Sequence, residues 1–334
     1  MSIPMNIGRL SLSNGLFLAP MAGISDSAFR MVARSFGASL CYSEMISAEG
    51  LVRGTGRSFE YLASPPGDKP LGVQLFGAKP EALAEAAVIA VEHSADLVDI
   101  NMGCPVKKVV RNGAGAALMK DPARAVAVAS AVRRAVTCPL TVKLRSGWSE
   151  TSVNVVEIAR MIQDCGVDAV TVHPRTAVRG FRGDADWRLT AQVKNVLSIP
   201  VIGSGDIWTA DDIRRLKEVT GCDAVMVARG SLGNPWIFRD ALREEESGLS
   251  AGAPSPAERE ETIRRHMELA LAIYGKSRGM FIFRKHMLWY TKGLPGGARF
   301  RKAVLQERSG EAVLESLHRF LQSTEATMPT DGQA

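Results

Sequence analysis

The chain has 334 residues, 46% hydrophobic and 23% charged, a composition typical of a globular protein that can bury a sizeable core. It has no run of about 18 apolar residues, and residues 1–15 lack a signal-like apolar stretch, so we expect neither a membrane span nor secretion. The five cysteines form no Cys-x-x-Cys pair, which favours reduced cytoplasmic thiols over a metal site, and the net charge of +6 weakly favours an anionic partner.

Eight short apolar runs alternate with helix-like segments over residues 16–230. The runs are LFLAPMAG (16–23), LCYSEM (40–45), LGVQLFG (71–77), LVDINMG (97–103), LTVKLRSG (140–147), AVTVHPR (169–175), PVIGSGDI (200–207) and AVMVARG (224–230). Eight strands alternating with helices predict an α/β fold, a closed parallel (β/α)8 TIM barrel. A doubly wound open sheet is the alternative, but the first turn lacks the G-x-G-x-x-G motif.

The chain changes character after Phe238. Residues 243–260 (REEESGLSAGAPSPAERE) are polar and contain Pro and Gly, which indicates a surface connection, and residues 257–325 show helical periodicity without strand alternation. We therefore expect a barrel over 1–240, a small all-helical domain over 255–325 and a flexible tail over 326–334. The charge of this helical domain is uneven: residues 275–308 carry nine Lys or Arg and one acid, so this part of it is strongly basic.

Chemically active residues follow the predicted strands. In TIM barrels the functional groups gather at the carboxyl ends of the strands. These ends supply Pro20, Met21, Ala22, Gln74, Asn101, Cys104, Lys143, Arg145, His173, Arg175, Ser204, Gly205, Asp206, Ala228 and Arg229. We expect amide, thiol, ammonium, imidazole and guanidinium groups to meet at one mouth of the barrel.

Three of these groups have alternative interpretations. The Gly-rich loops at 203–206 and 228–230 could bind a phosphate through backbone N–H groups, or could only make tight turns. Lys143 lies inside an apolar strand, so it either pairs with an acid such as Asp99 or faces an electron-rich ring or a phosphate. His173 is the only one of the five histidines at a strand end, and its placement is compatible with either function or packing.

Cys104 differs from the other four cysteines. It follows a strand end, in a turn shaped by Gly103 and Pro105, and the cations of the next segment (107–111) could tune its pKa. It could be a nucleophile or a proton donor. A cysteine-protease site would need a base, for which His173 is available, and an oxyanion hole, which nothing else in the sequence resembles.

Several of these segments resemble the tRNA-dihydrouridine synthases, nearest the bacterial B-type branch. The segments are LAPMAGISDSAFR (18–30), VQLFG (73–77), INMGCPVKKVVRNGAGAALM (100–119), VKLRSGW (142–148), VHPRT…F-x-G-x-ADW (172–187), GSGDI (203–207), VMVARGSLGNPWIF (225–238) and FRKHMLWYTKGLPG (283–296). The resemblance covers nearly the whole chain. It implies a TIM barrel that binds FMN, a helical domain that binds tRNA, and NADPH-dependent reduction of the C5–C6 double bond of a D-loop uridine.

The resemblance also implies roles for individual residues. Reduced flavin would deliver a hydride to C6 of uracil and Cys104 would protonate C5, as a general acid. The implied flavin-binding residues are Pro20, Met21 and Ala22 at the ring, Gln74 and Lys143 at its pyrimidine edge, His173 against it, and Ser204, Gly205, Asp206, Ala228 and Arg229 at the phosphate. Asn101 would orient the uracil or the flavin, and Arg175 is placed with the substrate-binding residues.

The basic helical domain gains a use from this resemblance, because Lys and Arg contacts to phosphates supply most of the affinity for RNA. We predict that tRNA is bound by Lys276, Arg278, Arg284, Lys285, Arg299 and Arg301; a solvated helix face is the alternative. No protein partner and no membrane are implied. Two other functions remain open: an FMN barrel that acts on free pyrimidines or dihydroorotate, and a nucleic-acid-binding protein that has lost catalysis.

Overall fold

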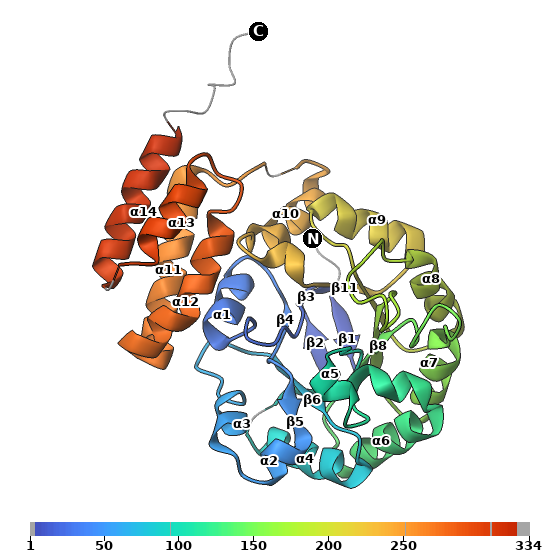
Figure 1. Ribbon diagram of the computed structural model, residues 1–334. Helices are drawn as coiled ribbons and strands as arrows, with labels where there is room; N and C mark the ends of the chain where they lie inside the picture. The colour runs from blue at the N-terminus through green and yellow to red at the C-terminus, as the bar shows by residue number, and fades with distance from the viewer. Residues whose placement is uncertain (1–3, 94, 251, 308, 326–334) are drawn as a thin grey trace.

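The computed structural model describes residues 4–93, 95–250, 252–307 and 309–325, and its centre is a closed parallel barrel (Figure 1). The barrel strands are β3 (Leu16–Leu18), β4 (Leu40–Tyr42), β6 (Leu71–Phe76), β7 (Leu97–Met102), β8 (Leu140–Arg145), β9 (Ala169–His173), β10 (Val201–Ser204) and β11 (Ala224–Val227). Strand β11 pairs with β3, and β4 pairs with β6, which closes the ring. All eight predicted strands are confirmed, and the open-sheet alternative is wrong. A two-residue strand, β5 (Ile46–Ser47), adds to β6.

Helices surround the barrel (Figure 1). They are α1 (Ser27–Ser35), α2 (Ala48–Val52), α3 (Gly56–Glu60), α4 (Pro80–Glu92), α5 (Lys107–Val110), α6 (Pro122–Ala135), α7 (Val155–Asp164), α8 (Trp187–Val196), α9 (Ala210–Thr220) and α10 (Trp236–Ser247), with 3-10 turns at Gly115–Lys120 and Arg229–Ser231. Local signals explain their ends. Helix α9 begins with a capping box between Thr209 and Asp212 and ends at Gly221, whose φ of 65° suits glycine.

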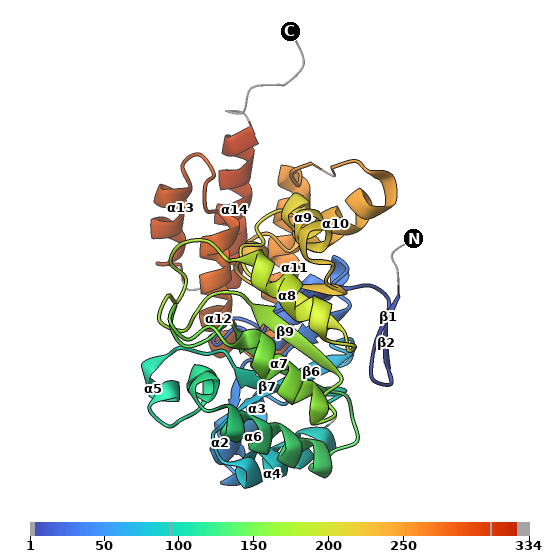
Figure 2. The same ribbon diagram turned by 90° about the vertical axis from the view of Figure 1, so that its right-hand side faces the viewer.

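Successive side chains of each barrel strand point alternately outward, toward the helices, and inward, toward the barrel interior. Outward residues such as Val73, Val98 and Val142 pack with the helices in one large apolar cluster. At one end of the barrel, inward residues of other strands form a second apolar cluster with Ile7 and Leu12. These two belong to the hairpin of β1 (Met5–Ile7) and β2 (Leu10–Leu12), which was not predicted. Figure 2 places the hairpin at the end of the barrel opposite α5, so it plugs the end away from the carboxyl ends of the strands.

The second unit is a bundle of α11 (Pro256–Tyr274), α12 (Lys276–Tyr290), α13 (Gly297–Val304) and α14 (Gly310–Glu325), which lies beside α1 (Figure 1). Helix α10 continues to Ser247, so the expected boundary at residue 240 falls inside the last barrel helix. The surface connection predicted over 243–260 is too long for the same reason, since α10 occupies its start and α11 its end. The expected tail over 326–334 lies outside the described residues.

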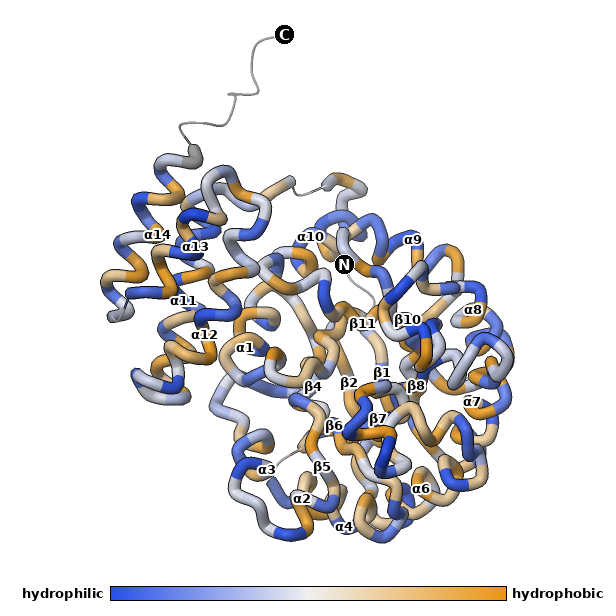
Figure 3. Tube along the Cα trace, viewed as in Figure 1, coloured by the Kyte–Doolittle hydropathy of each residue, from blue (hydrophilic) through white to orange (hydrophobic). Residues whose placement is uncertain are grey.

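The helices alternate between hydrophilic and hydrophobic residues along their turns, as expected for helices with one buried face (Figure 3). Within the described part of the chain, no helix combines the length and the apolarity needed to cross a membrane.

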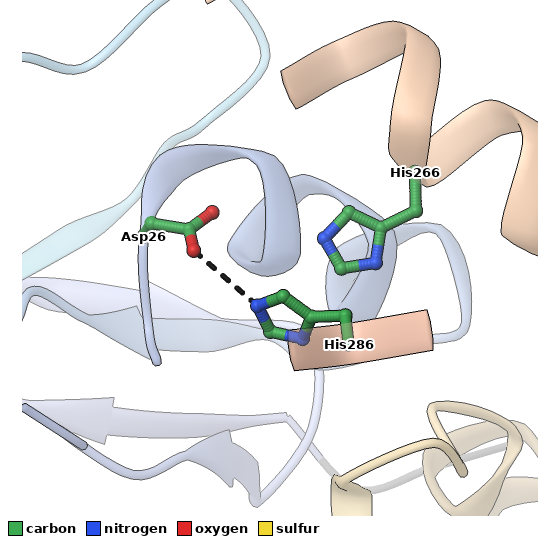
Figure 4. A group of neighbouring side chains, drawn as sticks. All are labelled: Asp26, His266 and His286. Atoms are coloured by element: carbon green, nitrogen blue, oxygen red, sulfur yellow. Dashed lines mark hydrogen bonds and ion pairs between the residues drawn. The ribbon is translucent and has the colours of Figure 1, made fainter. Parts of the chain in front are cut away.

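A buried polar cluster joins the barrel to the helical bundle (Figure 4). Asp26 caps α1 through a hydrogen bond from the N–H of Phe29 to Oδ1 (3.1 Å), while its Oδ2 lies 3.4 Å from His286 Nε2 and 3.7 Å from Lys285 Nζ. His266 adds a third ring, and the candidate ligand atoms of Asp26, His266 and His286 all lie within 4.8 Å of one another. Because the carboxylate already serves the helix cap and an ammonium, we interpret the cluster as an interface contact rather than a metal site.

Candidate active site

A layer of polar side chains faces the barrel interior above the apolar end. The parallel register aligns Gln74 with Asp99, Asp99 with Thr141, and Asn101 with Lys143. Residues in register point to the same side of a sheet, so Gln74, Asp99 and Thr141 lie next to one another at one level, and Asn101 and Lys143 lie side by side at the next. The strand pairing thus assembles amide, carboxylate and ammonium groups from segments far apart in the sequence.

This layer forms one wall of a cavity of about 510 Å³ at the carboxyl ends of the strands. The cavity brings together all the predicted cofactor-binding residues with Asn101 and Cys104: Pro20, Met21, Ala22, Gln74, Asn101, Cys104, Lys143, His173, Ser204, Gly205, Asp206, Ala228 and Arg229. Its size lies in the range of roughly 300–1,000 Å³ that is usual for small-molecule sites. Arg175 is not among the lining residues.

The loops after β10 and β11 pack tightly against each other and against His173. Gly205 has a φ of 101°, and a Cβ there would lie 2.8 Å from His173 Cδ2, so only glycine fits. The Ser204 hydroxyl donates to the carbonyl of Met226 (2.9 Å). That side chain therefore ties the two loops together, and because its one hydroxyl hydrogen is used, Ser204 can donate to a ligand only through its backbone N–H.

Asp206 and Arg175 support the β10 loop from behind. Asp206 Oδ2 accepts hydrogen bonds from Arg175 Nη2 (2.6 Å) and from the N–H of Ala185 (2.7 Å). Arg175 is buried and also donates to the carbonyl of Gly183. The structure therefore places Arg175 in a supporting ion pair behind the pocket wall. Arg229, 3.6 Å from the other Asp206 oxygen, lines the cavity, and so does Arg145.

Two ionisable groups in the polar layer, the buried Asp99 and the half-buried Lys143, have displaced pKa values. Burial raises the pKa of Asp99 to about 7, although hydrogen bonds from Thr141 and Gln74 and the charge of Lys143 oppose this. Burial also lowers the pKa of Lys143 to about 8, together with the charge of Arg145, while Asp99 opposes the shift. Asp99 acts on Lys143 only through its charge, whereas Lys143 lines the cavity, so the structure favours the alternative in which the ammonium faces a ligand.

His173 is neutral near pH 7. Burial lowers the pKa of its imidazole well below the usual value, and the surrounding cations Lys143, Arg145, Arg175 and Arg229 act in the same direction. Its Nε2 lies 3.3 Å from Nη1 of Arg175. Because a guanidinium can only donate, Nε2 is the acceptor and the ring proton lies on Nδ1.

The turn that carries Cys104 is fixed on three sides. The N–H of Cys104 donates to Asn101 Oδ1 (2.9 Å), its carbonyl accepts from the N–H of Ala116 (3.0 Å), and Arg145 Nε donates to the carbonyl of Gly103 (2.7 Å). Burial raises the pKa of the Cys104 thiol, so the sulfur holds its proton at neutral pH. A protonated thiol suits a proton donor better than a nucleophile.

The cation that acts on Cys104 is not one of those expected from the sequence. The charge of Arg145 partly opposes the rise in pKa, whereas Lys107, Lys108 and Arg111 are exposed. Arg145 is the last residue of β8, and it was predicted from the sequence to lie at the barrel mouth with the other strand-end residues, but without a role.

Two aromatic residues at the cavity mouth were also missed. Phe181 and Trp208 line the cavity while remaining 58% and 48% exposed, unusual values for large apolar side chains. The guanidinium of Arg229 lies over both rings, 4.6 Å from the first centroid and 4.9 Å from the second. Phe181 belongs to the F-x-G-x-ADW segment and Trp208 directly follows GSGDI, so both lie at recognisable motifs.

The six cations expected to bind RNA have different environments. Lys276 and Arg299 are exposed, and Arg278 pairs with Glu60 at 2.6 Å. Arg284 and Arg301 each donate to a backbone carbonyl of their own bundle, and Lys285 donates to the carbonyl of Gly23 in the barrel. Lys276 and Arg299 are thus the most available for an external anion.

Comparison with known proteins places these features in a family. The model of the dihydrouridine synthase family matches residues 17–325. This chain belongs to the dihydrouridine synthase family. The match spans the barrel and the helical bundle together, so the family resemblance seen in the sequence motifs is confirmed.

Relatives of this dihydrouridine synthase are similar over nearly their full length. The chain is 40% identical to tRNA-dihydrouridine synthase B of Xanthomonas campestris pv. campestris, covering 97% of this chain and 98% of the relative. It is 41% identical to tRNA-dihydrouridine synthase B of Pasteurella multocida, with 90% of each chain covered. It is 38% identical to the probable tRNA-dihydrouridine synthase 1 of Synechocystis, covering 92% of this chain and 86% of the relative.

Two solved structures share the barrel of this dihydrouridine synthase at low sequence identity. Histamine dehydrogenase from Rhizobium sp. 4-9 superposes with a TM-score of 0.55 at 14% identity, over 80% of this chain and 50% of the other. An old yellow enzyme homologue from Zymomonas mobilis superposes with a TM-score of 0.54 at 15% identity, over 74% of this chain and 93% of the other. At such low sequence identities, the two comparisons show only that the fold is shared.

Proposed function

We propose that this dihydrouridine synthase reduces the C5–C6 double bond of a uridine in the D-loop of tRNA, with FMN as cofactor and NADPH as reductant. The observation that carries the proposal is a protonated Cys104 thiol on the wall of a cavity suited to a flavin. The names of the similar enzymes support tRNA as the substrate. The proposal places the enzyme in the cytoplasm, with its tRNA substrate.

The cavity residues fit FMN in shape and chemistry. Pro20, Met21 and Ala22 offer an apolar wall to a flat ring, and Gln74 and Lys143 offer hydrogen-bond donors to its polar edge. At the other side, the backbone of Gly205 and Ala228 and the Arg229 guanidinium suit a phosphate. We assign these residues to the ring and the phosphate of FMN respectively.

Cys104 supplies the proton. When bound and reduced, FMN supplies the hydride for C6 of uracil. The protein adds a proton to C5 from Cys104 Sγ, which is protonated because burial raises its pKa. The thiolate left on Sγ is stabilised by the positive charge of Arg145, the cation that opposes that rise. His173, neutral in its setting, fills the cavity wall without competing as an acid.

The helical bundle supplies affinity for tRNA in this proposal. A uridine in the folded tRNA is stacked, so it must be turned out of its stack to enter the cavity. We assign phosphate contacts to Lys276, Arg278, Arg284, Lys285, Arg299 and Arg301, with Lys276 and Arg299 as the leading candidates because of their exposure.

The deciding experiment measures dihydrouridine by mass spectrometry in unmodified tRNA transcript incubated with protein, FMN and NADPH. Cys104→Ala should lower the rate about 10²–10⁴-fold, the usual contribution of a general acid, and should keep bound FMN. The matched control is Cys165→Ala, because Cys165 is also half-buried but lies at the end of α7, away from the cavity. Its rate should remain that of the wild type.

The same assay separates the alternatives. Equal rates for Cys104→Ala and wild type would leave the enzyme assignment standing and remove the proton-donor role. Reduction of free uracil or dihydroorotate chemistry without any dihydrouridine in tRNA would favour a free-pyrimidine enzyme. Protein that neither binds FMN nor forms dihydrouridine would refute the proposal.

A further inference from the structure

A chain of hydrogen bonds runs from the closed interior of the barrel to the Cys104 turn. Thr141 Oγ1 donates to Asp99 Oδ1 and Gln74 Nε2 donates to Asp99 Oδ2, both at 2.6 Å. Asn101 Nδ2 donates to Gln74 Oε1 at 2.8 Å. Finally, the N–H groups of Gly103 and Cys104 donate to Asn101 Oδ1 at 3.1 and 2.9 Å. We call this series the Asp99 chain.

The direction of the Asp99 chain is determined from both ends. Backbone N–H groups can only donate, so the Asn101 atom that faces Cys104 must be Oδ1, and Nδ2 must face Gln74. At the other end a carboxylate accepts, so the Gln74 atom that faces Asp99 must be Nε2. Both constraints give the same orientation of the two amides, and any flip of one would set two donors or two acceptors against each other.

We propose that Asp99 is a positioning residue, the terminal acceptor that orients Gln74 and Asn101 and through them holds the Cys104 turn. Asp99 itself does not line the cavity, so it acts only through the two amides, which do. The effect of Asp99 on the position of Cys104 does not depend on which reaction the protein catalyses. The importance of that position for catalysis rests on the proposed function.

The Asp99 chain also determines what the cavity offers to a ligand. Each side-chain amide nitrogen carries two hydrogens, and the Asp99 chain uses one from Gln74 and one from Asn101. Both amide oxygens are already occupied as acceptors within the chain. The two residues therefore present N–H donors to the cavity, and the ligand atoms opposite them must be acceptors, such as the carbonyl oxygens of a pyrimidine ring.

Because Asp99 is buried, its hydrogen bonds are costly to break, and it therefore fixes the orientation of its partners. Asp99 is fully buried, and the other ionisable groups that act on it or are affected by it are Lys143 and Tyr42. A buried acceptor that loses its donors, or a donor that loses its acceptor, is costly, so the network holds one arrangement. If Asp99 takes up a proton, its protonated oxygen can donate to the Thr141 hydroxyl. Its other oxygen can still accept the hydrogen bond from Gln74, so the series is kept.

The test uses flavin-free protein and the rate at which iodoacetamide alkylates Cys104, followed on the Cys104 peptide by mass spectrometry. Asp99→Leu removes the terminal acceptor and should raise the alkylation rate about tenfold, because the freed turn exposes the thiol. Asp99→Asn keeps an oxygen for Gln74 and offers its amide to Thr141, so it should recover most of the wild-type protection, to within about threefold.

Two further variants complete the design. Gln74→Met is of similar size, breaks the middle of the Asp99 chain and should behave like Asp99→Leu, which keeps the test valid if Asp99→Leu does not fold. The matched control is Thr171→Val, because Thr171 is equally buried, lies in register with Lys143, and has a hydroxyl without a hydrogen-bond partner among the described residues. Its alkylation rate should equal that of the wild type.

If Cys104 is alkylated at the wild-type rate in both Asp99→Leu and Gln74→Met, the proposal is wrong. It is also wrong if Thr171→Val raises the alkylation rate as much as these two variants do. The expected pattern supports the Asp99 chain even if the wild type makes no dihydrouridine, in which case only the proposed function fails. If dihydrouridine forms, Asp99→Leu should lower kcat about tenfold with Asp99→Asn closer to the wild type, as expected for a group that acts through others.

Discussion

In the proposed function, Lys143 contributes to flavin binding at the expense of the stability of the folded protein. Its ammonium is held in a cavity wall where burial and Arg145 lower its pKa from 10.5 to about 8. The unfolded chain therefore holds more protons than the folded chain between these values, and the unfavourable contribution of this lysine is fully present below about pH 8. That contribution is relieved as the pH rises toward 10.5.

Lys143→Met should therefore stabilise the flavin-free protein near pH 7 by about 1–2 kcal/mol, discounted because water reaches the cavity. The gain should shrink as the pH approaches 10.5. Urea denaturation at several pH values measures this, with Lys302→Met as control, because Lys302 is exposed on α13. A variant that is less stable than the wild type at pH 7, or a difference that does not change with pH, would contradict the expectation. The same variant should bind FMN more weakly.

At the same scale, the site residues differ in how well the sequence predicted them. Gln74, Asn101, Lys143 and His173 could be placed because the carboxyl ends of parallel strands meet at one mouth. Arg175 also follows a strand, yet its side chain turns behind the wall to Asp206. The direction of a side chain just past a strand end depends on loop packing, which the spacing of residues does not encode.

At the scale of elements, the join between α1 and the helical bundle depends on few polar groups. His286 on α12 reaches Asp26 at the start of α1, and burial lowers the pKa of the imidazole, so it is neutral near pH 7. Phe29 packs on its ring, with centroids 4.9 Å apart. Removing this ring leaves both a cavity and a buried carboxylate that has lost a partner.

His286→Ala should lower the free energy of unfolding of the bundle by about 2–4 kcal/mol. Hydrogen exchange followed by mass spectrometry should show faster exchange in α11 and α12, with the barrel strands unchanged. His318→Ala is the matched control, because His318 lies exposed on α14 and its contacts with Glu260 and Gln322 are at the surface. If exchange in α11 and α12 is as slow as in the control, the Asp26 contact does not hold the bundle in place.

The elements that sequence reasoning located well are those with strong periodicity or clear caps. The eight barrel strands are apolar runs separated by helices, whereas β1 (MNI) and β2 (LSL) each contain a polar residue and have no helix between them, so they stand outside that pattern. The REEES segment was assigned to a connection because it is polar, but its residues favour helices, and α10 continues until Gly248 takes a left-handed conformation with φ 70°. A solvated helix end and a polar linker have the same composition.

For the molecule as a whole, the proposed function requires the small helical bundle to bind the tRNA whose uridine enters the cavity of the separate barrel. The net charge of +6 is modest, so RNA binding must depend on where cations are available rather than on total charge. Most of the six predicted cations contact protein groups, while Lys276 at the start of α12 and Arg299 on α13 are exposed. Arg284 and Arg301, which donate to carbonyls, should affect stability more than affinity.

Charge reversal at these two positions tests this arrangement. Lys276→Glu and Arg299→Glu should each weaken tRNA binding about tenfold at moderate salt, and each lost phosphate contact should reduce the salt dependence of log K by roughly 0.7–0.9. Filter binding at several salt concentrations measures both quantities. The rate at saturating tRNA should change little, because neither residue lines the cavity.

The control is Arg134→Glu, which alters an exposed cation in the last turn of α6. Because that turn leads into the start of β8, it lies toward the end of the barrel away from the cavity. If Arg134→Glu weakens tRNA binding as much as the bundle variants do, the helical bundle is not the RNA-binding surface.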